Sequence, residues 1–546
     1  MELADYVTPH RQSFDRLWLN QEKNTIVVAA PDAVLAKLEV LASKAAERTV
    51  EMELGLWEKL LAAQASNVTE TVRQASPKLP TEIGGQPFTI RAHQQEALRL
   101  WHKEQGKGIL ALATGAGKTV TALYGMVKLS QISPCLVIVI AVPYQNLADQ
   151  WCEEANRFGM RAIRCYESKA DWHEELNRAT HEINFGLREL TVIVVVNRTL
   201  KSSAFQSCLK RLPMAQTLWI GDECHHHGAE GIENFLPFSA RFRMGLSATP
   251  VHYLDNARNT RLEQFYGPVV YEYSLSQAII DNVLTPYDYH VMLIELTFEE
   301  TEQFLDLSQQ IGKLYAKDLQ AGLSQNESEI LKSLLRSRTR LVGAAENKLK
   351  VLHDHLQSTP RSKHVLFYCS EGVVNSTEAA VVDDDDSIGV CAQSNVAAVC
   401  QLLTNSGWNV SKFTAAETRR DREVLLEHFK LGKIDALVAM RCLDEGIDIP
   451  SCSIAYILAS TKDPRQFIQR RGRILRRAPG KQFATIYDFV VVPPNSATLE
   501  GNPHARKLIE GELRRVAEFA GLAQNSTKAY EVLRPTLINY GLEYCV

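Results

Sequence analysis

The stretch Gly108-Ile-Leu-Ala-Leu-Ala-Thr-Gly-Ala-Gly-Lys-Thr119 decides the fold of this chain. Its apolar first half predicts a buried strand, its glycines predict a tight loop, and the residues that follow predict a helix. A loop of small residues in this place can point its backbone N–H groups at phosphate oxygens, and the helix N-terminus adds its dipole. We therefore expect phosphate contacts from Thr114, Gly115, Ala116, Gly117, Lys118 and Thr119.

Two side chains of this loop have a more specific chemistry. Lys118 can reach the terminal phosphates of a nucleotide, and the Thr119 hydroxyl can bind magnesium. The strict phosphate-loop pattern starts with a glycine where this chain has Leu112. A short glycine–lysine–threonine run also occurs by chance in surface turns, so the loop alone predicts only a possible nucleotide site.

A second apolar run, Leu218–Ile220, ends in two adjacent carboxylates, Asp222 and Glu223. The alternative interpretation is an acidic strand end that caps a turn. Since both motifs follow a strand, we predict that Asp222 holds magnesium and that Glu223 orients and deprotonates the attacking water. The expected cofactors are ATP and Mg²⁺.

Strand-like apolar runs alternate with amphipathic stretches in both halves of the chain, which is typical of parallel sheets covered on both faces. The predicted strands are Ile109–Leu112, Leu136–Val142, Val192–Val196, Leu218–Ile220, Met244–Leu246, Val365–Cys369, Ala436–Met440, Ser453–Leu458 and Ala484–Phe489. The fold class is α/β, with two parallel-sheet domains in tandem.

With these motifs in place, the sequence resembles the superfamily 2 helicases of the DExH-box type. In the first half, the segments Ile90–Gln95, Val142–Trp151 and Ser247–Thr249 match motifs of that family. The resemblance implies adenine contacts, nucleic-acid backbone contacts, and coupling of hydrolysis to strand movement, in that order. The residues concerned are Arg91 and Gln94 for adenine, Pro143 and Gln150 for the backbone, and Ser247 and Thr249 for coupling.

In the second half, Leu443–Pro450 and Gln469–Arg476 resemble two further helicase motifs. The resemblance assigns nucleotide contacts to Gly446 and Asp448, and catalytic roles to Gln469, Arg473 and Arg476. The two arginines would be the fingers that supply positive charge to the transferring phosphoryl group. Without the family, four arginines in seven residues are also compatible with a solvated basic patch.

The resemblance implies two RecA-like domains with helical additions. We expect a helical N-terminal region over 1–86, the ATP-binding domain over 87–275, and the second domain over 276–498. A helical insertion is expected at about 297–358, and a helical tail, with a helix over Ala505–Leu522, at 499–546.

Motif details are most similar to the branch that contains DNA repair translocases and restriction-enzyme motor subunits. The predicted function is ATP-dependent movement on, or remodelling of, double-stranded DNA in repair or defence. Two alternatives stay open: an RNA helicase, and an ATP-gated clamp that does not separate strands. A separately encoded nuclease or modification subunit is a possible partner, because the chain has no credible nuclease motif of its own.

Composition narrows the class of protein. The 60 basic and 64 acidic residues give a net charge of −4, so nucleic acid must bind to local grooves rather than to a basic coat. Eleven cysteines with no CxxC pair favour a reduced, cytoplasmic protein over a disulfide framework. No signal peptide and no membrane span is expected.

Three weaker patterns remain. His428, Lys430 and Asp435 fit a phospholipase D-type nuclease pattern, but that chemistry needs a second histidine copy, which the sequence lacks. The run His225–His227 has no partner at metal-ligand spacing. The basic stretch with Arg336, Arg338, Arg340, Lys348 and Lys350 is either a solvated helix face or an arm that contacts duplex phosphates.

Overall fold

A computed structural model describes residues 77–83, 86–133, 135–251, 255–369, 387–414, 417–440, 452–458, 472, 474–478, 480–492 and 503–543. Contacts divide the chain into two units, Met1–Gln74 and Ala75–Val546, and every described residue belongs to the second. The helices expected before residue 77 therefore lie outside the described residues. Among the described helices, none has both the length and the apolar character needed to cross a bilayer.

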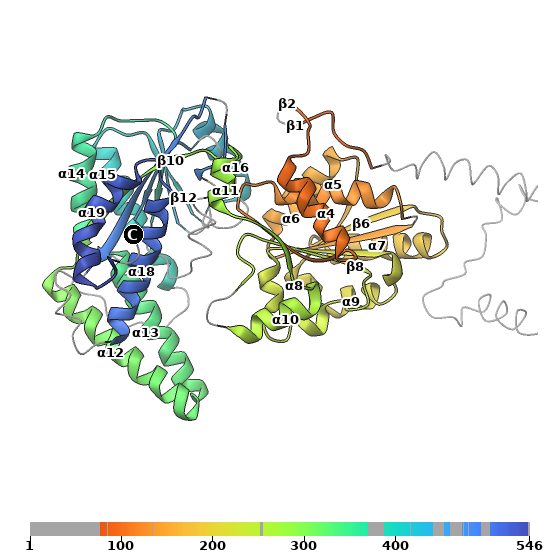
Figure 1. Cartoon of the computed structure of the whole chain (residues 1–546), viewed down its shortest axis with the longest axis horizontal. Coiled ribbons are helices and arrows are strands. Elements are labelled where there is room, and N and C mark those ends of the chain that lie inside the picture. The colour runs from red at the N-terminus through yellow and green to blue at the C-terminus, as the bar shows by residue number, and fades with distance from the viewer. Residues whose placement is uncertain are drawn as a thin grey trace, which may run out of the picture. The chain divides into compact units, whose positions relative to one another are not determined.

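The first half of this unit contains a seven-stranded parallel sheet (Figure 1). In spatial order its strands are β5 (Ala162–Cys165), β6 (Leu190–Val196), β4 (Leu136–Val142), β7 (Thr217–Asp222), β8 (Phe242–Ser247), β3 (Lys107–Leu112) and β9 (Val269–Tyr273). The two motif-bearing strands, β3 and β7, both flank β8, so their carboxyl ends lie close together.

Helices cover both faces of this sheet, because successive side chains of each strand point to opposite sides. Ile138 and Ile140 of β4 pack into one apolar cluster, and Val137 and Val139 pack into the other. The first cluster includes side chains of α4 (Ala92–Lys103), α5 (Lys118–Ser130) and α6 (Gln145–Arg157). The second includes side chains of α7 (Lys169–Asn184), α9 (Ser203–Leu209) and α10 (Asn256–Tyr266).

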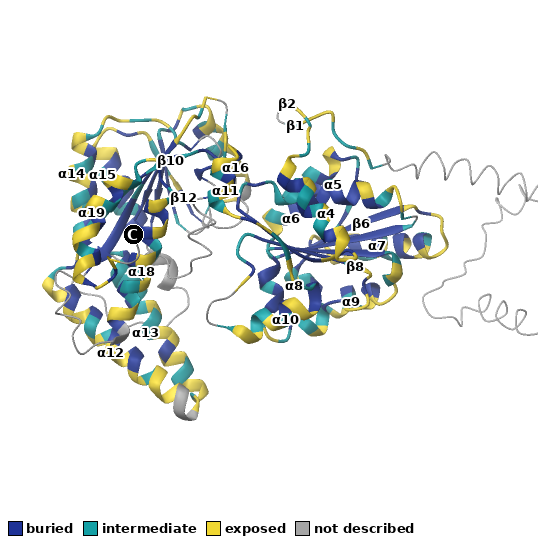
Figure 2. Cartoon of the chain, viewed as in Figure 1, coloured by how far each residue is buried: buried dark blue, intermediate teal, exposed yellow. Residues whose placement is uncertain are grey.

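The second half contains a six-stranded parallel sheet. In spatial order its strands are β10 (Tyr287–Glu295), β15 (Ala484–Val492), β14 (Ile454–Ile457), β11 (Val365–Tyr368), β13 (Ala436–Ala439) and β12 (Val410–Phe413). The interior strands of both sheets carry the colour of buried residues in Figure 2, as expected for sheets covered on both faces. The predicted α/β class with two parallel sheets is confirmed.

Several helices accompany the second sheet. The stretch expected to be helical is three helices, α12 (Phe298–Ala321), α13 (Gln325–Gly343) and α14 (Asn347–Ser358). Thr297 and Ser324 start the first two with side-chain caps and capping boxes. After α14, the described helices are α15 (Ser387–Asn405), α16 (Arg419–Lys430), α18 (Pro503–Gly521) and α19 (Ser526–Asn539).

The last two helices pack on the second sheet. Tyr287 of the edge strand β10 donates from its hydroxyl to the Phe519 carbonyl at 2.8 Å. Asn525, between α18 and α19, accepts from the Tyr289 backbone N–H at 2.8 Å and donates to the Tyr289 carbonyl at 3.1 Å. This amide therefore satisfies edge-strand groups that a neighbouring strand would otherwise pair.

Candidate nucleotide-binding site

The predicted phosphate loop joins β3 to α5 and has the backbone that its glycines predict. Gly115 has φ +87° and Gly117, the residue before α5, has φ +90°, and both values lie in the left-handed region that favours glycine. A Cβ on Gly115 would lie 2.9 Å from Leu284 Cδ2 and 3.1 Å from the Gly472 carbonyl oxygen. The loop therefore needs glycine for its conformation and also for the close approach of other segments.

Three neighbours hold this loop in place. The Ala113 N–H donates to the Tyr273 carbonyl at 2.9 Å, and His93 Nε2 lies 3.0 Å from the Ala116 carbonyl oxygen. Gln94 Nε2 donates to the Gly117 carbonyl at 3.3 Å, and Gln94 Oε1 accepts from the Arg91 N–H at 3.0 Å. Of the two predicted adenine residues, Gln94 thus contacts the loop directly, and Arg91 contacts Gln94.

His93 is a functional candidate that the sequence analysis missed. Its ring stacks on Tyr273 with centroids 4.0 Å apart, and burial lowers its pKa. A neutral imidazole can donate from Nε2 to the Ala116 carbonyl without placing a charge in the core. Only its position directly before Gln94 in the sequence could have pointed to it.

Asp222 ends β7 with its carboxylate almost fully buried. The Trp151 indole Nε1 donates to Asp222 Oδ2 at 2.8 Å, and the Glu223 N–H donates to Oδ1 at 3.0 Å. Burial raises the pKa of Asp222 to about 6, with a further rise from the Glu223 charge and opposition from Lys118 and Trp151. A nearby divalent cation would favour the ionised form of this carboxylate. The hydrogen bonds from Trp151 and from the Glu223 N–H hold the carboxylate in one orientation, as donors around a metal ligand do.

Glu223 follows in a left-handed conformation, with φ +46° and ψ +49°. For a non-glycine residue this backbone costs roughly 1–2 kcal/mol, and such strain concentrates at functional sites. Glu223 Oε1 lies 3.4 Å from Lys118 Nζ, and their side chains are only 18% and 11% exposed. The carboxylate expected to act as base and the lysine expected to hold phosphate therefore face each other.

A chain of contacts leads from Glu223 to the segment expected to couple hydrolysis to movement. His225 Nδ1 lies 3.5 Å from Glu223 Oε2 and 3.2 Å from Ser247 Oγ. Ser247 Oγ also accepts from the Thr249 N–H at 3.2 Å. His225 therefore connects the Glu223 carboxylate to Ser247, and Ser247 in turn contacts Thr249.

The third histidine of the run, His227, packs elsewhere. Its Nδ1 lies 2.6 Å from the Tyr266 hydroxyl and its Nε2 lies 3.1 Å from Asn197 Oδ1. Burial lowers its pKa to about 3. Its two ring nitrogens are engaged in the core of the first domain.

From the second half of the chain, Gly472 and Arg476 lie against the phosphate loop. A Cβ on Gly472 would lie 2.4 Å from Thr114 Cβ, and the Arg476 Cγ lies 3.2 Å from the position of a Cβ on Gly115. Thr285 fixes this segment, because its N–H donates to the Leu475 carbonyl at 2.7 Å. The other predicted residues of this half, Gln469, Arg473, Gly446 and Asp448, lie outside the described residues.

The residues present fit ATP and magnesium. Thr114 Oγ1 is buried without a hydrogen-bond partner at the loop, where an incoming phosphate could accept from it. Among described side chains, no group of three or more histidine, cysteine or acidic residues could hold a metal by itself. Magnesium commonly uses one or two protein ligands together with phosphate oxygens and water, which suits Asp222 and Thr119.

The segment expected to follow nucleic acid begins α6. Pro143 and Gln150 are half-buried and retain surface for such a contact. Trp151, quoted in the same motif, has no exposed surface and instead contacts Asp222. That part of the motif serves the carboxylate, because the indole lies on the helix face that packs against the sheet.

The basic stretch was predicted to be a solvated helix face or an arm that contacts duplex phosphates. For two of its five residues, Arg338 and Lys348, this prediction is wrong. Arg338 is 5% exposed and donates to Ser308 Oγ at 3.1 Å. Lys348 is 3% exposed, and its ammonium donates to the carbonyls of Val342, Gly343 and Leu458. Both charges are buried by helix packing, while Arg336 and Lys350 are exposed.

The nuclease-like pattern does not assemble a site among the described residues. His428 and Lys430 lie in the last turn of α16. Asp435 Oδ2 accepts from the Asn409 N–H at 3.0 Å, and the Asp435 carbonyl accepts from Val365. Asp435 thus connects the residue before β12 to the first residue of β11, which is a structural role.

Family models match both halves of the chain. Residues 87–252 match the model described as "Type III restriction enzyme, res subunit", and residues 376–478 match the "Helicase conserved C-terminal domain". The chain carries the two motor domains of a superfamily 2 helicase. These matches support the repair and restriction branch of that superfamily and an ATP-hydrolysing enzyme that binds nucleic acid.

Curated relatives of this helicase are distant in sequence. The "DNA 3'-5' translocase XPB2" of Sulfurisphaera tokodaii is 25% identical over 420 residues, which cover 73% of this chain and 81% of the relative. The "Putative DNA 3'-5' helicase Rad25" of Haloarcula marismortui is 22% identical over 398 residues, which cover 71% of this chain and 51% of the relative. The chain therefore spans about half the length of the second protein.

A solved structure titled "ATP-dependent Type ISP restriction-modification enzyme LlaBIII bound to DNA" has a similar fold. Its TM-score is 0.50 at 18% identity, over 79% of this chain and 30% of the other. This similarity supports the tandem arrangement of parallel-sheet domains.

Proposed function

We propose that this helicase uses magnesium and ATP to move on, or to remodel, double-stranded DNA. The observation that supports this most directly is the approach of Gly472 to Thr114. Because the segment from the second domain reaches the phosphate loop of the first, a nucleotide bound there would contact both domains. Hydrolysis can then change how the domains are held together, as a motor requires.

In the first domain, the loop from Thr114 to Thr119 would hold the phosphates and Lys118 would neutralise the terminal ones. Arg91 and Gln94 would contact the adenine. Asp222 and Thr119 would hold magnesium, which when bound would offset the negative charge of the phosphates. Glu223 would accept a proton from the attacking water at a carboxylate oxygen.

In the second domain, Arg473 and Arg476 would stabilise the charge that develops on the transferring phosphoryl group. Gln469, Gly446 and Asp448 would complete the nucleotide contacts. The domain limits assigned above, 87–275 and 276–498, form part of this proposal.

Pro143 and Gln150 would contact the nucleic-acid backbone. Ser247 and Thr249 would respond to changes at Glu223 through His225. The His225 Nδ1 atom lies near both the Ser247 hydroxyl and the Glu223 carboxylate. DNA is preferred to RNA as the track because both curated relatives described above are named as DNA translocase or helicase. The choice of a duplex rests on the motif resemblance to repair translocases and restriction-enzyme motor subunits.

The test compares ATP turnover with duplex DNA, single-stranded DNA, duplex RNA and no nucleic acid. We expect the largest stimulation with duplex DNA, and equal or greater stimulation by RNA would overturn the choice of track. A triplex-displacement assay then separates a motor from a clamp, since a clamp should not strip the third strand during ATP turnover.

The partner proposal has its own test. A separately encoded nuclease or modification subunit should co-purify in stoichiometric amount from the native host. Recovery of the helicase alone at native expression levels counts against such a partner.

A further inference from the structure

The contact between Trp151 and Asp222 has consequences beyond packing. Trp151 lies in the second turn of α6, and Asp222 ends β7. The indole has no exposed surface, and Nε1 lies 2.8 Å from Asp222 Oδ2. Indole nitrogen can only donate, so the direction of this hydrogen bond is certain.

This bond fixes the rotation of the carboxylate. Asp222 Oδ1 already accepts from the Glu223 N–H at 3.0 Å. With one donor on each oxygen, the carboxylate plane is set, and each oxygen keeps a lone pair for another ligand. Loss of the indole donor would leave Oδ2 buried with one hydrogen bond fewer, and the carboxylate could rotate.

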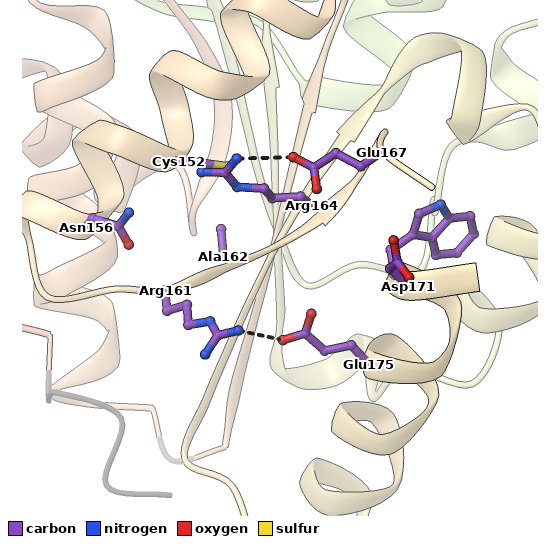
Figure 3. Close-up of a pocket in the computed structure, with 9 residues that line it drawn as sticks. Cys152, Asn156, Arg161, Ala162, Arg164, Glu167, Asp171 and Glu175 are labelled. Carbon is purple, nitrogen blue, oxygen red and sulfur yellow. Dashed lines mark hydrogen bonds and ion pairs between the residues drawn. The ribbon is translucent and has the colours of Figure 1, made fainter. Parts of the chain in front are cut away.

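The same helix has a second polar anchor that does not involve Asp222. The Tyr166 hydroxyl donates to Asp149 Oδ1 at 2.9 Å, and Cys152 Sγ lies 3.5 Å from that hydroxyl. Figure 3 shows this side of α6, where the Arg164 guanidinium pairs with Glu167 at 3.1 Å. Helix α6 is therefore held through Trp151 on one side and through Asp149 on the other.

We propose that Trp151 is a positioning residue that holds the metal-binding carboxylate of Asp222 and connects it to α6. The inference rests on the proposed function, because Asp222 is assigned there to magnesium. Pro143, two residues before α6, and Gln150, next to Trp151 within it, are assigned there to the DNA backbone. A shift of α6 on binding DNA would move the indole, and with it the carboxylate.

The direct test is the magnesium dependence of nucleotide binding in the full-length protein. Binding of a fluorescent non-hydrolysable ATP analogue is titrated with Mg²⁺ in wild type, Trp151→Phe and Tyr166→Phe. Partners of metal ligands typically contribute about 10- to 100-fold in metal affinity. We expect Trp151→Phe to raise the half-saturating Mg²⁺ concentration by roughly that factor and to leave binding in EDTA unchanged.

Tyr166→Phe is the matched control, since it removes the other anchor of α6 without touching Asp222. An unchanged Mg²⁺ dependence in Trp151→Phe overturns the inference. An equal shift in Tyr166→Phe also overturns it, because general loosening of α6 would then explain both results. Trp151→His keeps a ring N–H beside the carboxylate and should recover most of the loss.

The connection to DNA is tested by repeating the titration with saturating duplex. In wild type, DNA should lower the half-saturating Mg²⁺ concentration, and in Trp151→Phe this response should disappear. No response in wild type, or an equal response in both proteins, overturns the connection.

A measurement on the wild type covers the case in which Trp151 variants fail to fold. The chain has seven tryptophans, so a protein labelled with ¹⁵N at the indoles gives few signals. Adding Mn²⁺ with the ATP analogue should broaden at least one indole N–H beyond detection, and no broadening overturns the inference.

The failure of the proposed function gives a different pattern. If wild type binds the analogue with no Mg²⁺ dependence, or Lys118→Ala binds as wild type does, the assignment of the ATP site fails. If those controls behave as expected and only Trp151→Phe lacks a shift, the ATP site stands and the role of Trp151 fails.

Discussion

Replacing Glu223 by glutamine should separate ATP binding from ATP turnover. The carboxylate oxygen lies 3.4 Å from Lys118 Nζ, so Glu223 and a bound phosphate compete for the same ammonium. Glutamine keeps the size of the side chain but removes the negative charge and the basic oxygen. The variant should therefore bind ATP more tightly and hydrolyse it far more slowly.

The magnitude follows from that distance. At an effective dielectric constant of about 20, unit charges 3.4 Å apart attract by roughly 5 kcal/mol. Desolvation of the two mostly buried groups offsets most of this attraction. A net contribution of about 1–2 kcal/mol corresponds to an ATP affinity roughly 5- to 30-fold higher in Glu223→Gln. Loss of the general base should lower turnover by about 10²- to 10⁴-fold.

The assay measures the ATP dissociation constant by isothermal titration and steady-state turnover with saturating duplex DNA. Glu230→Gln, at an exposed position seven residues along, is the control and should match wild type in both. Wild-type turnover in Glu223→Gln would refute the assignment of the base. Lost turnover with unchanged ATP affinity would show that the Lys118–Glu223 pair does not compete with phosphate.

Four further outcomes are expected. Lys118→Ala should bind ATP about 10- to 100-fold more weakly by titration, since hydrogen bonds to charged groups contribute roughly 1.5–3 kcal/mol, and wild-type affinity would contradict this. Arg473→Ala and Arg476→Ala should each slow ATP hydrolysis by about 10³-fold, while DNA affinity measured by filter binding stays nearly unchanged. A larger loss of DNA binding than of turnover would show that these arginines contact DNA instead. Because burial lowers the pKa of His227 to about 3, the unfolded chain takes up this proton first as the pH falls below 6.5. The free energy of unfolding in urea should thus fall by about 2 kcal/mol more between pH 7 and pH 5 in wild type than in His227→Gln; equal slopes would exclude this histidine. Lys348→Met should lower the free energy of unfolding by about 1–3 kcal/mol, because the carbonyls of Val342, Gly343 and Leu458 lose a hydrogen-bond donor. Lys350→Met, at an exposed position, should have little effect.

Sequence patterns predicted the interior of each sheet and missed its edges. All nine predicted strands are interior strands, and the four missed strands of the two large sheets, β5, β9, β10 and β12, are the outermost ones. Interior strands such as β4 are buried along their whole length and read as continuous apolar runs. Edge strands such as β12 (Val-Ser-Lys-Phe) are short and partly exposed, so their composition resembles that of a loop.

In the nucleotide site as well, sequence patterns predicted some residues and missed others. Lys118, Asp222 and Glu223 belong to contiguous motifs at strand ends, so the sequence alone could place them together. His93, Trp151 and Lys348 were missed or misread because their roles depend on what lies against them in three dimensions. A tryptophan in an amphipathic helix predicts core packing, and only the fold shows that its N–H meets a carboxylate.

The Asn525 side chain has a consequence for the order in which this protein is made. It pairs with both backbone groups of Tyr289, a residue synthesised 236 positions earlier. At roughly 5–20 residues per second, the ribosome needs on the order of 10 s or more to travel between them. Throughout that interval the β10 edge waits without its final partner. The nascent second domain therefore exposes a strand edge until its last helices emerge, which makes this interval the one in which holding chaperones matter most.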